Sequence, residues 1–474
     1  MNILFIDPYL SETESNVGLG YLCGVLKAHG HYCRVVKGAE SVCKVSRIIM
    51  EEQPDIVGFS IKSSTVLRVI DAAMEVRKSY DGPIICGGPH ITIDGEAFLN
   101  EHSCFDIGVA GEGEDTILEI IDYLLGNRKL EEIKGIIARS GDGLLRTELR
   151  APVDDLDMIP FPDYTHFDIF SNGMKVYWVC TSRGCPFKCT FCNVPSISGR
   201  KWRFRSVSNI IEELEHALIT HPGIQCIDIA DDNFTFDISR VKEFCMQLIK
   251  KKLNFRWKCS NGIRADRIDE ELVSLMKDSG CTGIDFGIES GSPAVFAGIK
   301  KGETLKTIEE SVNMVKAAGM RVAASFIIGL PGSDFQSDME SIAFAKKLNL
   351  DAVWFNLFCP FKKTEGYDIL MADNSVRFLR DWKNVPFMFH KRKVYCIFET
   401  DDYLCKERIS AFMKGNLQLF NYNFIRDYSV AAWSPLRLLP LFASIVKYDI
   451  RNTHKHISRM TREMFSHVKK LFRK

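Results

Sequence analysis

The chain lacks an excess of charge of either sign. Its 474 residues include 61 Lys and Arg and 61 Asp and Glu, so the formal net charge is zero. Because a strongly basic surface is the usual signature of nucleic-acid binding, no nucleic-acid partner is expected. With 46% hydrophobic and 26% charged residues, the composition is that of an ordinary globular protein, and the length suffices for two or three domains.

A long apolar run is missing as well. Residues 2–6 (NILFI) form an apolar stretch typical of a strand and too short for the apolar region of an export signal. Residues 428–448 are apolar, but Pro435, Arg437 and Pro440 interrupt them, whereas a transmembrane helix needs about 20 mostly apolar residues. The 16 cysteines fit a reducing compartment. We therefore expect a cytoplasmic protein whose scattered cysteines are mostly small buried residues.

A fourth cysteine is missing beside three that are closely spaced. Cys185, Cys189 and Cys192 stand at spacings of four and three, just after an apolar run over 176–180. Soft thiolate ligands favour iron–sulfur clusters, zinc or copper(I). A structural zinc site needs four protein ligands, and neither Cys180 nor His166 is obviously placed to complete one. A cluster with one open iron fits better.

The C-x3-C-x2-C motif, with Phe191 just before its last cysteine, resembles the signature of radical S-adenosylmethionine (SAM) enzymes. The resemblance implies that Cys185, Cys189 and Cys192 hold a [4Fe–4S] cluster whose fourth iron is chelated by the amino and carboxylate groups of SAM. It also implies that Phe191 flanks the adenine. The alternative is three unrelated cysteines in a Cys-rich chain.

Short apolar runs alternate with helical patterns over residues 1–130. Expected strands cover 3–6, 33–36, 56–60, 84–86 and 107–109, and expected helices cover 18–29, 42–51, 66–80 and 116–125. The alternation predicts an α/β domain with a doubly wound, Rossmann-like parallel sheet. Ligands of such sheets bind at the carboxyl ends of the strands. The candidate residues in the loops there are Asp7, Ser60, Gly87, Gly88, Glu112 and Gly113.

These loops resemble those of the cobalamin-binding domain that precedes the barrel in one radical SAM subgroup. Residues 87–90 (GGPH) and 111–114 (GEGE) match its loops, and residues 18–31 match its first helix. The resemblance implies a bound cobalamin. Methionine-synthase-like domains carry a cobalt-ligating histidine after the first strand, which this chain lacks after Asp7, so no histidine ligand is expected. His90 is expected to shape the nucleotide-tail pocket or to face solvent. The alternative is a Rossmann-like docking domain without cofactor.

The pattern changes after residue 130. Residues 131–173 are expected to form a linker with a hairpin around 140–143 and prolines at 152, 160 and 162. Over 174–375 the alternation resumes, with strands expected at 175–181, 226–230, 255–259, 283–288, 321–328 and 352–357. Helices are expected at 208–220, 239–251, 270–279, 305–318 and 337–348. Six strands predict a partial (β/α)6 TIM-like barrel, open on one side, with its functional residues at the carboxyl ends of the strands.

Two loops of this barrel carry candidate SAM ligands. Asp231 and Asp232 begin a sequence, DDNFT, that resembles the family motif at the SAM amino group, where carboxylates accept hydrogen bonds. Adjacent extended residues point opposite ways, so one aspartate is expected to face the site and the other to cap the next helix. Ser260 follows the next strand. Arg264 is a candidate partner for the SAM carboxylate, with a surface salt bridge as the alternative.

The later loops match further family motifs. Glu289 and Ser290 lie in a sequence close to Gly-Ile-Glu-Ser-Gly, which implies hydrogen bonds to the ribose. Gly329 and Pro331 belong to a Gly-Leu-Pro-Gly turn similar to the one near the adenine. Residues 360–364 (PFKKT) depart from the usual Pro-x-x-Gly-Thr, so the resemblance does not extend securely to the substrate side of the barrel.

The C-terminal region, 376–474, matches no catalytic motif. Its aromatics are expected to pack as helices over the open barrel and to line the substrate pocket. In residues 450–474, apolar residues fall at helical spacing, with eight cations against one anion, Glu463. Basic amphipathic helices often lie on anionic membranes, which would make a lipid-like substrate attractive. A solvated helix packed on its own barrel explains the pattern equally well.

The resemblance implies a reaction. The reduced cluster, supplied by an electron donor of the flavodoxin or ferredoxin type, would cleave SAM to methionine and a 5′-deoxyadenosyl radical, which removes hydrogen from an unactivated carbon of an unknown small-molecule or lipid-like substrate. Methylcobalamin would then methylate that carbon, and a second SAM would remethylate the cobalamin. The alternatives are cobalamin-dependent ring closure, rearrangement or oxidation without methyl transfer, a non-catalytic cluster or cobalamin sensor, and a zinc-binding structural protein.

Overall fold

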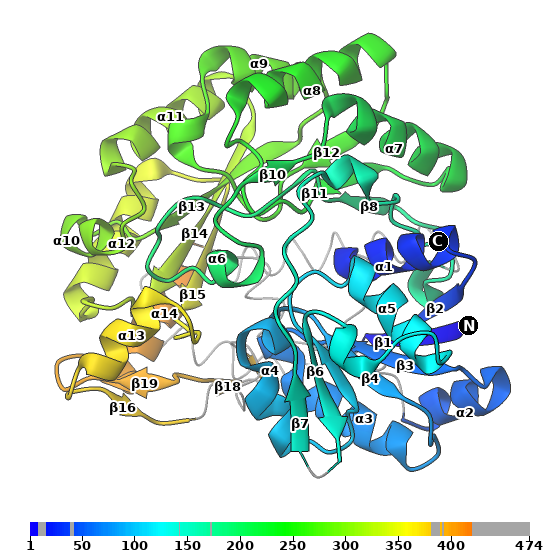
Figure 1. Ribbon diagram of the computed structural model, residues 1–474. Helices are drawn as coiled ribbons and strands as arrows, with labels where there is room; N and C mark the ends of the chain where they lie inside the picture. The colour runs from blue at the N-terminus through cyan, green and yellow to red at the C-terminus, as the bar shows by residue number, and fades with distance from the viewer. Residues whose placement is uncertain are drawn as a thin grey trace, which may run out of the picture.

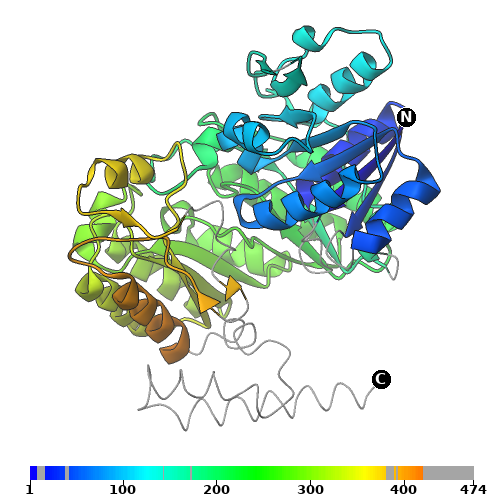
Figure 2. The same cartoon turned by 90° about the horizontal axis from the view of Figure 1, so that it is seen from below.

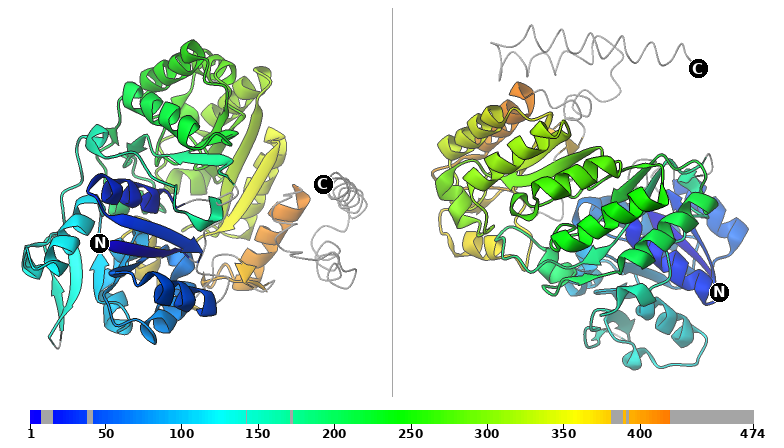
Figure 3. Two further views of the ribbon diagram at one scale, coloured as in Figure 1. Left: turned by 90° about the vertical axis from the view of Figure 1, so that its right-hand side faces the viewer. Right: turned by 90° about the horizontal axis from the view of Figure 1, so that it is seen from above.

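The computed structural model shows an N-terminal lobe and a barrel lobe side by side, with a smaller C-terminal part at the far edge of the barrel (Figures 1 and 3). It describes residues 1–7, 16–37, 42–141, 143–170, 173–380, 389–390 and 393–419. The loop after Asp7 and the basic tail at 450–474 lie outside the described residues. Among the described helices, none is long and apolar enough to cross a membrane.

The N-terminal lobe is built on a seven-stranded sheet with the order β2-β1-β3-β4-β5-β6-β7. The first five strands in the chain pair in parallel, as predicted. They are β1 (Asn2–Asp7), β2 (Tyr32–Lys37), β3 (Ile56–Ser60), β4 (Ile84–Gly87) and β5 (Ile107–Val109). Alternate residues of β1 face opposite sides: Ile3 and Phe5 join the core that continues into the barrel, whereas Leu4 and Ile6 join a separate core.

Helices cover both faces of this sheet (Figure 1). They are α1 (Val17–Ala28), α2 (Val42–Glu52), α3 (Val66–Arg77), α4 (Pro89–Glu101) and α5 (Glu114–Leu124). The sequence analysis missed α4, because the Gly-Gly-Pro-His pattern was interpreted as a loop. Pro89 is instead the first residue of the helix, where its fixed φ and missing N–H suit the first turn.

The hairpin predicted around residues 140–143 is present, and it extends the N-terminal sheet. β6 (Ile136–Ser140) pairs antiparallel with β5, and β7 (Gly143–Arg146) pairs with β6. The sheet thus reaches Arg146, beyond the boundary expected at residue 130. The rest of the linker packs under α1, where the backbone of Phe161 and the ring of Tyr164 touch Gly24 and Gly20.

The barrel consists of two three-stranded parallel sheets, ordered β12-β11-β8 and β13-β14-β15. All six predicted strands are found: β8 (Val176–Val179), β11 (Cys226–Ile229), β12 (Arg256–Lys258), β13 (Gly283–Glu289), β14 (Arg321–Ile328) and β15 (Ala352–Leu357). Isolated bridges from Trp257 to Cys281 and from Ile263 to Phe286 link the two sheets. The barrel is open between β8 and β15, and the β8 edge faces the N-terminal lobe (Figure 1).

The predicted outer helices are also present. They are α7 (Val207–Thr220), α8 (Ile238–Lys251), α9 (Glu270–Asp278), α11 (Leu305–Ala317) and α12 (Phe335–Leu348), with the short α10 (Pro293–Gly298) and α13 (Glu365–Ala372) between them. Each long helix begins at a Ser, Asp or Thr whose side chain accepts a hydrogen bond from the first turn, which satisfies an otherwise unpaired N–H. These caps are Ser206, Asp237, Asp269, Thr304 and Asp334.

The described C-terminal part combines one helix with short strands. β16 (Arg377–Phe378) pairs with β19 (Phe398–Glu399), and β17 (Phe389–His390) pairs with β18 (Lys393–Val394). Helix α14 (Cys405–Gln418) packs against β15 at the barrel edge (Figure 2). Asn416 on α14 donates to the carbonyl of Phe355 and accepts from its N–H, so this helix caps the exposed edge of β15.

Candidate functional site

The three motif cysteines lie on a loop that comes after β8, the first strand of the barrel. This loop runs from β9 (Ser182–Arg183) to the short helix α6 (Val194–Ile197), before β10 (Arg203–Phe204). Its backbone is tied to neighbouring elements, since Cys185 N–H donates to Gly199 O at 3.2 Å and Thr190 N–H donates to Ile299 O at 3.0 Å. Cys185, Cys189 and Cys192 are all partly buried.

The three sulfurs lie within one another's electrostatic field. Burial raises the pKa of Cys192 to about 12, and the neighbouring Cys189 and Cys185 add to the rise. Burial also raises the pKa of Cys189, against the nearby cations Lys301 and Arg264. Three thiolates so placed repel one another unless a metal centre balances their charge. Cys192 thus lies close enough to Cys185 and Cys189 to interact with them, and thiolates are the ligands of an iron–sulfur cluster.

No compact set of ligands for a single ion is seen in the described part of the chain: no three His, Cys, Asp or Glu side chains gather around one point there. Cys180 donates to Ser182 O at 3.3 Å, and His166 packs on Tyr32 with ring centroids 5.0 Å apart. The structure thus gives both candidate fourth ligands other partners.

The adjacent aspartates after β11 have different surroundings, but the predicted helix-capping role falls to neither of them. Asp231 is buried and accepts hydrogen bonds from Thr181 N, Thr181 Oγ1 and Ser182 Oγ at 2.5, 2.5 and 2.6 Å. It therefore fixes the start of the cluster loop. Asp232 lines the large cavity described below, with one oxygen accepting from Gly184 N–H at 3.0 Å. Neither aspartate caps α8, because Asp237 does.

Asn233, in the same motif, is a site residue that the sequence analysis did not single out. Its Nδ2 donates to Cys185 Sγ at 3.6 Å. Its Oδ1 is buried and has no hydrogen-bond partner within the described residues. Hydrogen bonds to cluster sulfurs tune cluster potentials. Asparagine in a turn is so common that the sequence alone gave no signal.

Glu289 lies at the end of β13 in a strained backbone. Its φ is +71°, next to an irregularity in the β13–β14 pairing, and such strain in a non-glycine residue is typical of functional sites. Its carboxylate is 3.7 Å from Lys301 Nζ, which is also 3.5 Å from Glu303. Burial raises the pKa of Glu289 despite this cation. Lys301, beside Cys189, is a second residue that sequence reasoning missed.

Arg264 has partners other than the one suggested by the motif. Its Nε and Nη2 donate to the two oxygens of Asp266 at 2.9 Å each, and Nη1 donates to Lys301 O at 2.7 Å. The guanidinium carbon lies 3.5 Å from the ring centroid of Phe187 in the cluster loop. Arg264 is buried, and the salt bridge that it forms is with Asp266. Its contact with Phe187 supports the cluster loop. A contact with the SAM carboxylate stays a prediction.

Ser290 and Phe191 are used for packing. Ser290 is buried, with Oγ 3.2 Å from Ser341 Oγ, and it accepts from Ser292 N–H at 3.2 Å. Ser290 thus contributes to the turn after Glu289. Phe191 is partly buried against the main core.

The C-terminal part holds the Gly329 turn in place. Gly329 has φ +80°, its N–H donates to Asp338 Oδ2 at 2.9 Å, and its carbonyl accepts from Arg408 Nη1 at 3.0 Å. Tyr403 also donates to Asp338, at 2.7 Å. A side chain at 329 would meet Arg408 at 2.4 Å. Residues from α14 and the preceding loop therefore fix the turn that contains Pro331.

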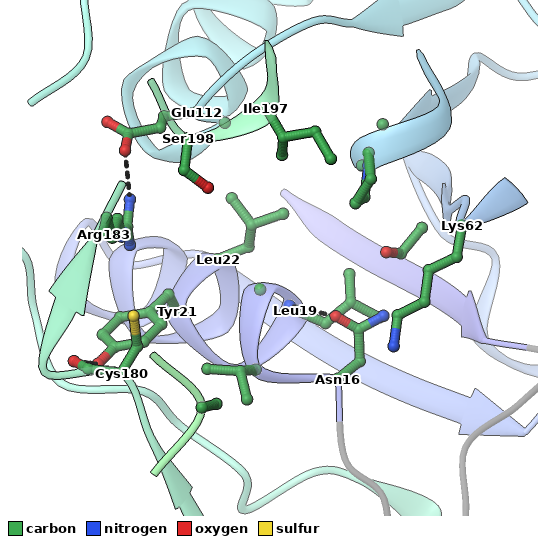
Figure 4. Close-up of a pocket in the computed structure, with 18 of the residues that line it drawn as sticks. Asn16, Leu19, Tyr21, Leu22, Lys62, Glu112, Cys180, Arg183, Ile197 and Ser198 are labelled. Carbon is green, nitrogen blue, oxygen red and sulfur yellow. Dashed lines mark hydrogen bonds and ion pairs between the residues drawn. The ribbon is translucent and has the colours of Figure 1, made fainter. Parts of the chain in front are cut away.

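One cavity of about 900 Å³ joins the two lobes. On the N-terminal side it is lined by the predicted residues Ser60, Gly87, Gly88, Glu112 and Gly113. From the barrel it is lined by Trp178, Cys180, Asp228, Asp232, Lys258 and Ser260. Asn16, Lys62, Leu22 and Ile197 surround its middle (Figure 4). The described lining includes no histidine.

Glycine backbone forms the N-terminal wall of this cavity. Gly88 has φ +99°, and a Cβ there would lie 3.0 Å from Ile61 O. A left-handed residue without a side chain lets the backbone approach a bound group closely. Asp7, near the same wall, is buried and accepts from Asn16 Nδ2 at 2.8 Å. The cavity, its glycine wall and its position suit a large planar cofactor such as the corrin of cobalamin.

Glu112 lines the cavity and also connects the lobes. One of its oxygens pairs with Arg183 at 3.1 Å (Figure 4). Glu112 also pairs with Arg203 at 2.8 Å and accepts from Val153 N–H at 2.7 Å. Arg183 further pairs with Glu114 at 2.6 Å. Burial raises the pKa of Glu112, but the arginines outweigh it and hold the pKa below its usual value. We call these four side chains the interlobe clasp.

Two other predicted features gain a clear role. Lys362, in the departing segment after β15, pairs with Asp94 at 2.9 Å, and Lys363 donates to Thr92 O at 3.0 Å. These lysines therefore connect the barrel to α4.

His90 is buried on α4, 3.2 Å from Ser63 Oγ and edge-on to Phe98. The expectation that it faces solvent was wrong, because the helix that begins at Pro89 turns it into the core. That it shapes the nucleotide-tail pocket stays a prediction.

Known proteins resemble this chain in sequence and in fold. A model of the radical SAM superfamily matches residues 179–345, and a model of the B12 binding domain matches residues 10–121. The chain is 32% identical over 377 residues, 78% of this chain and 81% of the relative, to an uncharacterized methyltransferase of Pyrococcus horikoshii. The chain belongs to the radical SAM superfamily.

This radical SAM enzyme has more distant relatives with different activities. It is 25% identical over 383 residues, 76% of this chain and 68% of the relative, to the anaerobic magnesium-protoporphyrin IX monomethyl ester cyclase of Rubrivivax gelatinosus. Its fold is similar to that of the radical SAM methyltransferase TsrM from Kitasatospora setae, solved with cobalamin and a [4Fe–4S] cluster. The TM-score is 0.73 at 16% identity, over 98% of this chain and 99% of that chain.

The cofactors predicted from the sequence are confirmed as a set. They are a [4Fe–4S] cluster, SAM and cobalamin. The chain offers the thiols of Cys185, Cys189 and Cys192 and the carboxylates of Asp232 and Glu289 for them, and the cavity has room for a planar cofactor beside glycine backbone. Which individual side chains touch each cofactor stays a prediction.

Proposed function

We propose that the enzyme C-methylates an unactivated carbon of a small molecule in a cobalamin-dependent reaction. When bound, the cluster and SAM supply a 5′-deoxyadenosyl radical and cobalamin supplies a methyl group. The single observation that supports the proposal is the continuous cavity, which runs from the glycine loops Gly87–Gly88 to Asp232 and Ser260. A carbon lying in it would be reachable from both lobes.

The residues of the chain would hold and shield the reactants. Cys185, Cys189 and Cys192 would hold the cluster, and Asp232 would accept hydrogen bonds from the SAM amino group. Glu289 would accept from the ribose hydroxyls. The clasp residues and Lys362 would keep the lobes closed, which excludes water and stray hydrogen donors from the cavity. A flavodoxin- or ferredoxin-type protein in the cytoplasm would supply electrons.

A second function has its own support. The similarity to a cyclase favours ring closure or oxidation without methyl transfer as the alternative. SAM labelled in its methyl group separates the two. Label in the product supports methylation, whereas 5′-deoxyadenosine together with an unlabelled, altered product refutes it.

The experiment needs no foreknowledge of the substrate. The protein is reconstituted anaerobically and supplied with cobalamin. It is then reduced in the presence of methyl-labelled SAM and an extract of small molecules. Release of 5′-deoxyadenosine supports the enzyme assignment over a non-catalytic sensor.

Binding of the full-length chain to anionic vesicles, compared with a chain ending at residue 449, tests the proposed membrane contact of the tail.

A further inference from the structure

The barrel interior carries charge where a core layer is expected. In register, Asp228 on β11 lies between Trp178 on β8 and Lys258 on β12, and all three line the cavity. Closed TIM-type barrels fill these inward positions with bulky apolar side chains. Here an ion pair takes their place, and both of its side chains line the cavity. The layer therefore forms a binding surface rather than a packed core.

Lys258 is the exposed partner of that ion pair. Its Nζ lies 2.8 Å from Asp228 Oδ2 and donates to Ser260 Oγ at 2.7 Å. An ammonium has three donors, and within the described residues no further acceptor bonds to it. The side chain is 42% exposed, against 5% for Asp228. The cation, not the carboxylate, therefore meets whatever enters the cavity.

Asp228 is already satisfied by the protein. Besides Lys258, it accepts from Ser260 N–H at 3.1 Å and from Ser260 Oγ at 2.7 Å. The hydroxyl that the sequence analysis assigned to SAM is thus held by Asp228 and positions the ammonium. The other nearby acid, Asp285 on β13, pairs with Arg321 at 3.1 Å. Neither carboxylate leaves a free negative charge to repel an anion at Lys258.

We propose that Lys258 binds an anionic oxygen group of the substrate, a carboxylate or a phosphate, inside the barrel. A charge-assisted hydrogen bond to the remaining ammonium donor would orient the molecule, and Trp178 would pack against its apolar part. This inference deepens the proposed function and rests on it for the identity of the ligand as substrate. It favours a polar, charged molecule over a lipid-like one.

The first test is chemical labelling of the lysine in the wild-type holoprotein, loaded with cluster and cobalamin. Reductive methylation of Lys258 is followed by peptide mass spectrometry with inorganic phosphate, acetate or neutral acetamide present. A saturating anion is expected to slow labelling of Lys258 roughly threefold or more, because it occupies the amine for most of the time. Lys201, a surface lysine paired with Asp154, serves as the internal control and should not change.

The pattern of protection decides between outcomes. Stronger protection by phosphate indicates a phosphate group, and stronger protection by acetate indicates a carboxylate. Equal labelling of Lys258 with every probe, or equal slowing by acetamide, overturns the proposal. Labelling uses formaldehyde and a hydride reductant and needs neither SAM nor turnover, so its failure is distinct from a failure to find labelled methyl in a product.

A second test uses variants and a binding readout. The effective anion from the first test should raise the melting temperature of the wild-type holoprotein and of Lys258→Arg, which keeps the charge. Lys258→Met should lose the shift. A shift that persists in Lys258→Met would show that the anion binds elsewhere and would contradict the assignment.

Discussion

At the carboxyl ends of the barrel strands the functional groups are side chains, whereas at the carboxyl ends of the N-terminal strands they are mostly backbone. The barrel loops present the thiols, Asp232 and Glu289. The N-terminal loops present Gly87 and Gly88, and two acidic residues there, Glu112 and Glu114, pair with barrel arginines. The barrel lobe is therefore expected to recognise its cofactors through reactive and charged side chains, and the N-terminal lobe through the shape of its backbone. The acidic residues of the N-terminal loops serve to join the two lobes.

The difference predicts how each lobe fails. Changes in the barrel loops should remove a ligand and its chemistry outright. Changes in the glycine loops should remove a bound cofactor by filling its space. Changes in the interlobe clasp should leave each site built but badly aligned, and changes in the C-terminal support should be milder still.

The largest effect is expected from the cluster cysteines. Alanine at Cys185, Cys189 or Cys192 should abolish the cluster and turnover, because two thiolates do not hold the cubane stably. Iron content and the broad visible absorbance of the anaerobically purified protein measure the loss of the cluster. Cys226→Ala, on β11 outside the cluster loop, is the control and should keep its iron. Turnover retained in any of the three loop variants would falsify the ligand assignment.

The next largest effect tests the backbone lobe. Gly88→Val should lose cobalamin yet keep the cluster, since its side chain would stand 3.0 Å from Ile61 O at φ +99°. The loss of cobalamin is measured from the absorbance of the cobalamin that the protein retains after gel filtration. Gly126→Val is the matched control, because Gly126 has φ +80° with nothing within 4 Å. Both carry backbone strain of about 1–3 kcal/mol, so equal cobalamin loss would show that strain alone is responsible.

A smaller effect is expected at the clasp. Arg183→Gln breaks ion pairs to Glu112 and Glu114 that are largely buried, and should lower the free energy of unfolding by about 3 kcal/mol. It should also lower methylated product relative to 5′-deoxyadenosine. Lys201→Gln, which breaks a pair exposed by 71% and 75%, should leave the free energy of unfolding almost unchanged, because exposed ion pairs contribute little. A coupling ratio unchanged in Arg183→Gln would show that the clasp does not align the lobes.

The smallest effect concerns pH and the Gly329 turn. Burial raises the pKa of Asp338 to about 7, so between its usual pKa and 7 the folded state binds more protons than the unfolded state. Stability from this group is therefore present at low pH and lost as pH rises to about 7. Asp338→Asn keeps both accepted hydrogen bonds and lacks the titration. Its free energy of unfolding relative to wild type should be higher at pH 8 than at pH 6, by at most about 1.4 kcal/mol for each pH unit below 7.

The opposite trend would contradict this assignment. If the difference between Asp338→Asn and wild type is the same at both pH values, the carboxyl titrates normally. Tyr403→Phe is the companion variant, because it removes one donor to the carboxylate and should raise the pKa of Asp338 further.

Much of the site was predictable because ligands and strands leave local signals. The spacing of Cys185 and Cys192, the Asp231–Asp232 turn and the six barrel strands all follow from short stretches of sequence. What failed was partner choice. Arg264 was predicted to meet a carboxylate, and it does, but the carboxylate is Asp266, two residues away. Nothing local indicates that Lys301 lies beside Cys189 or that Lys258 lies beside Asp228, since those neighbours come from different strands and loops.

By itself the sequence determined the cluster motif, the alternation of strands and helices in both lobes, and the glycine loops, because each depends on the spacing of neighbouring residues. Only the tertiary structure decided which aspartate faces the cavity, that Glu112 joins the lobes, and that α14 supports the Gly329 turn. Those outcomes depend on which distant surfaces are buried together. A buried charged group then pairs with the nearest group that compensates for its lost hydration.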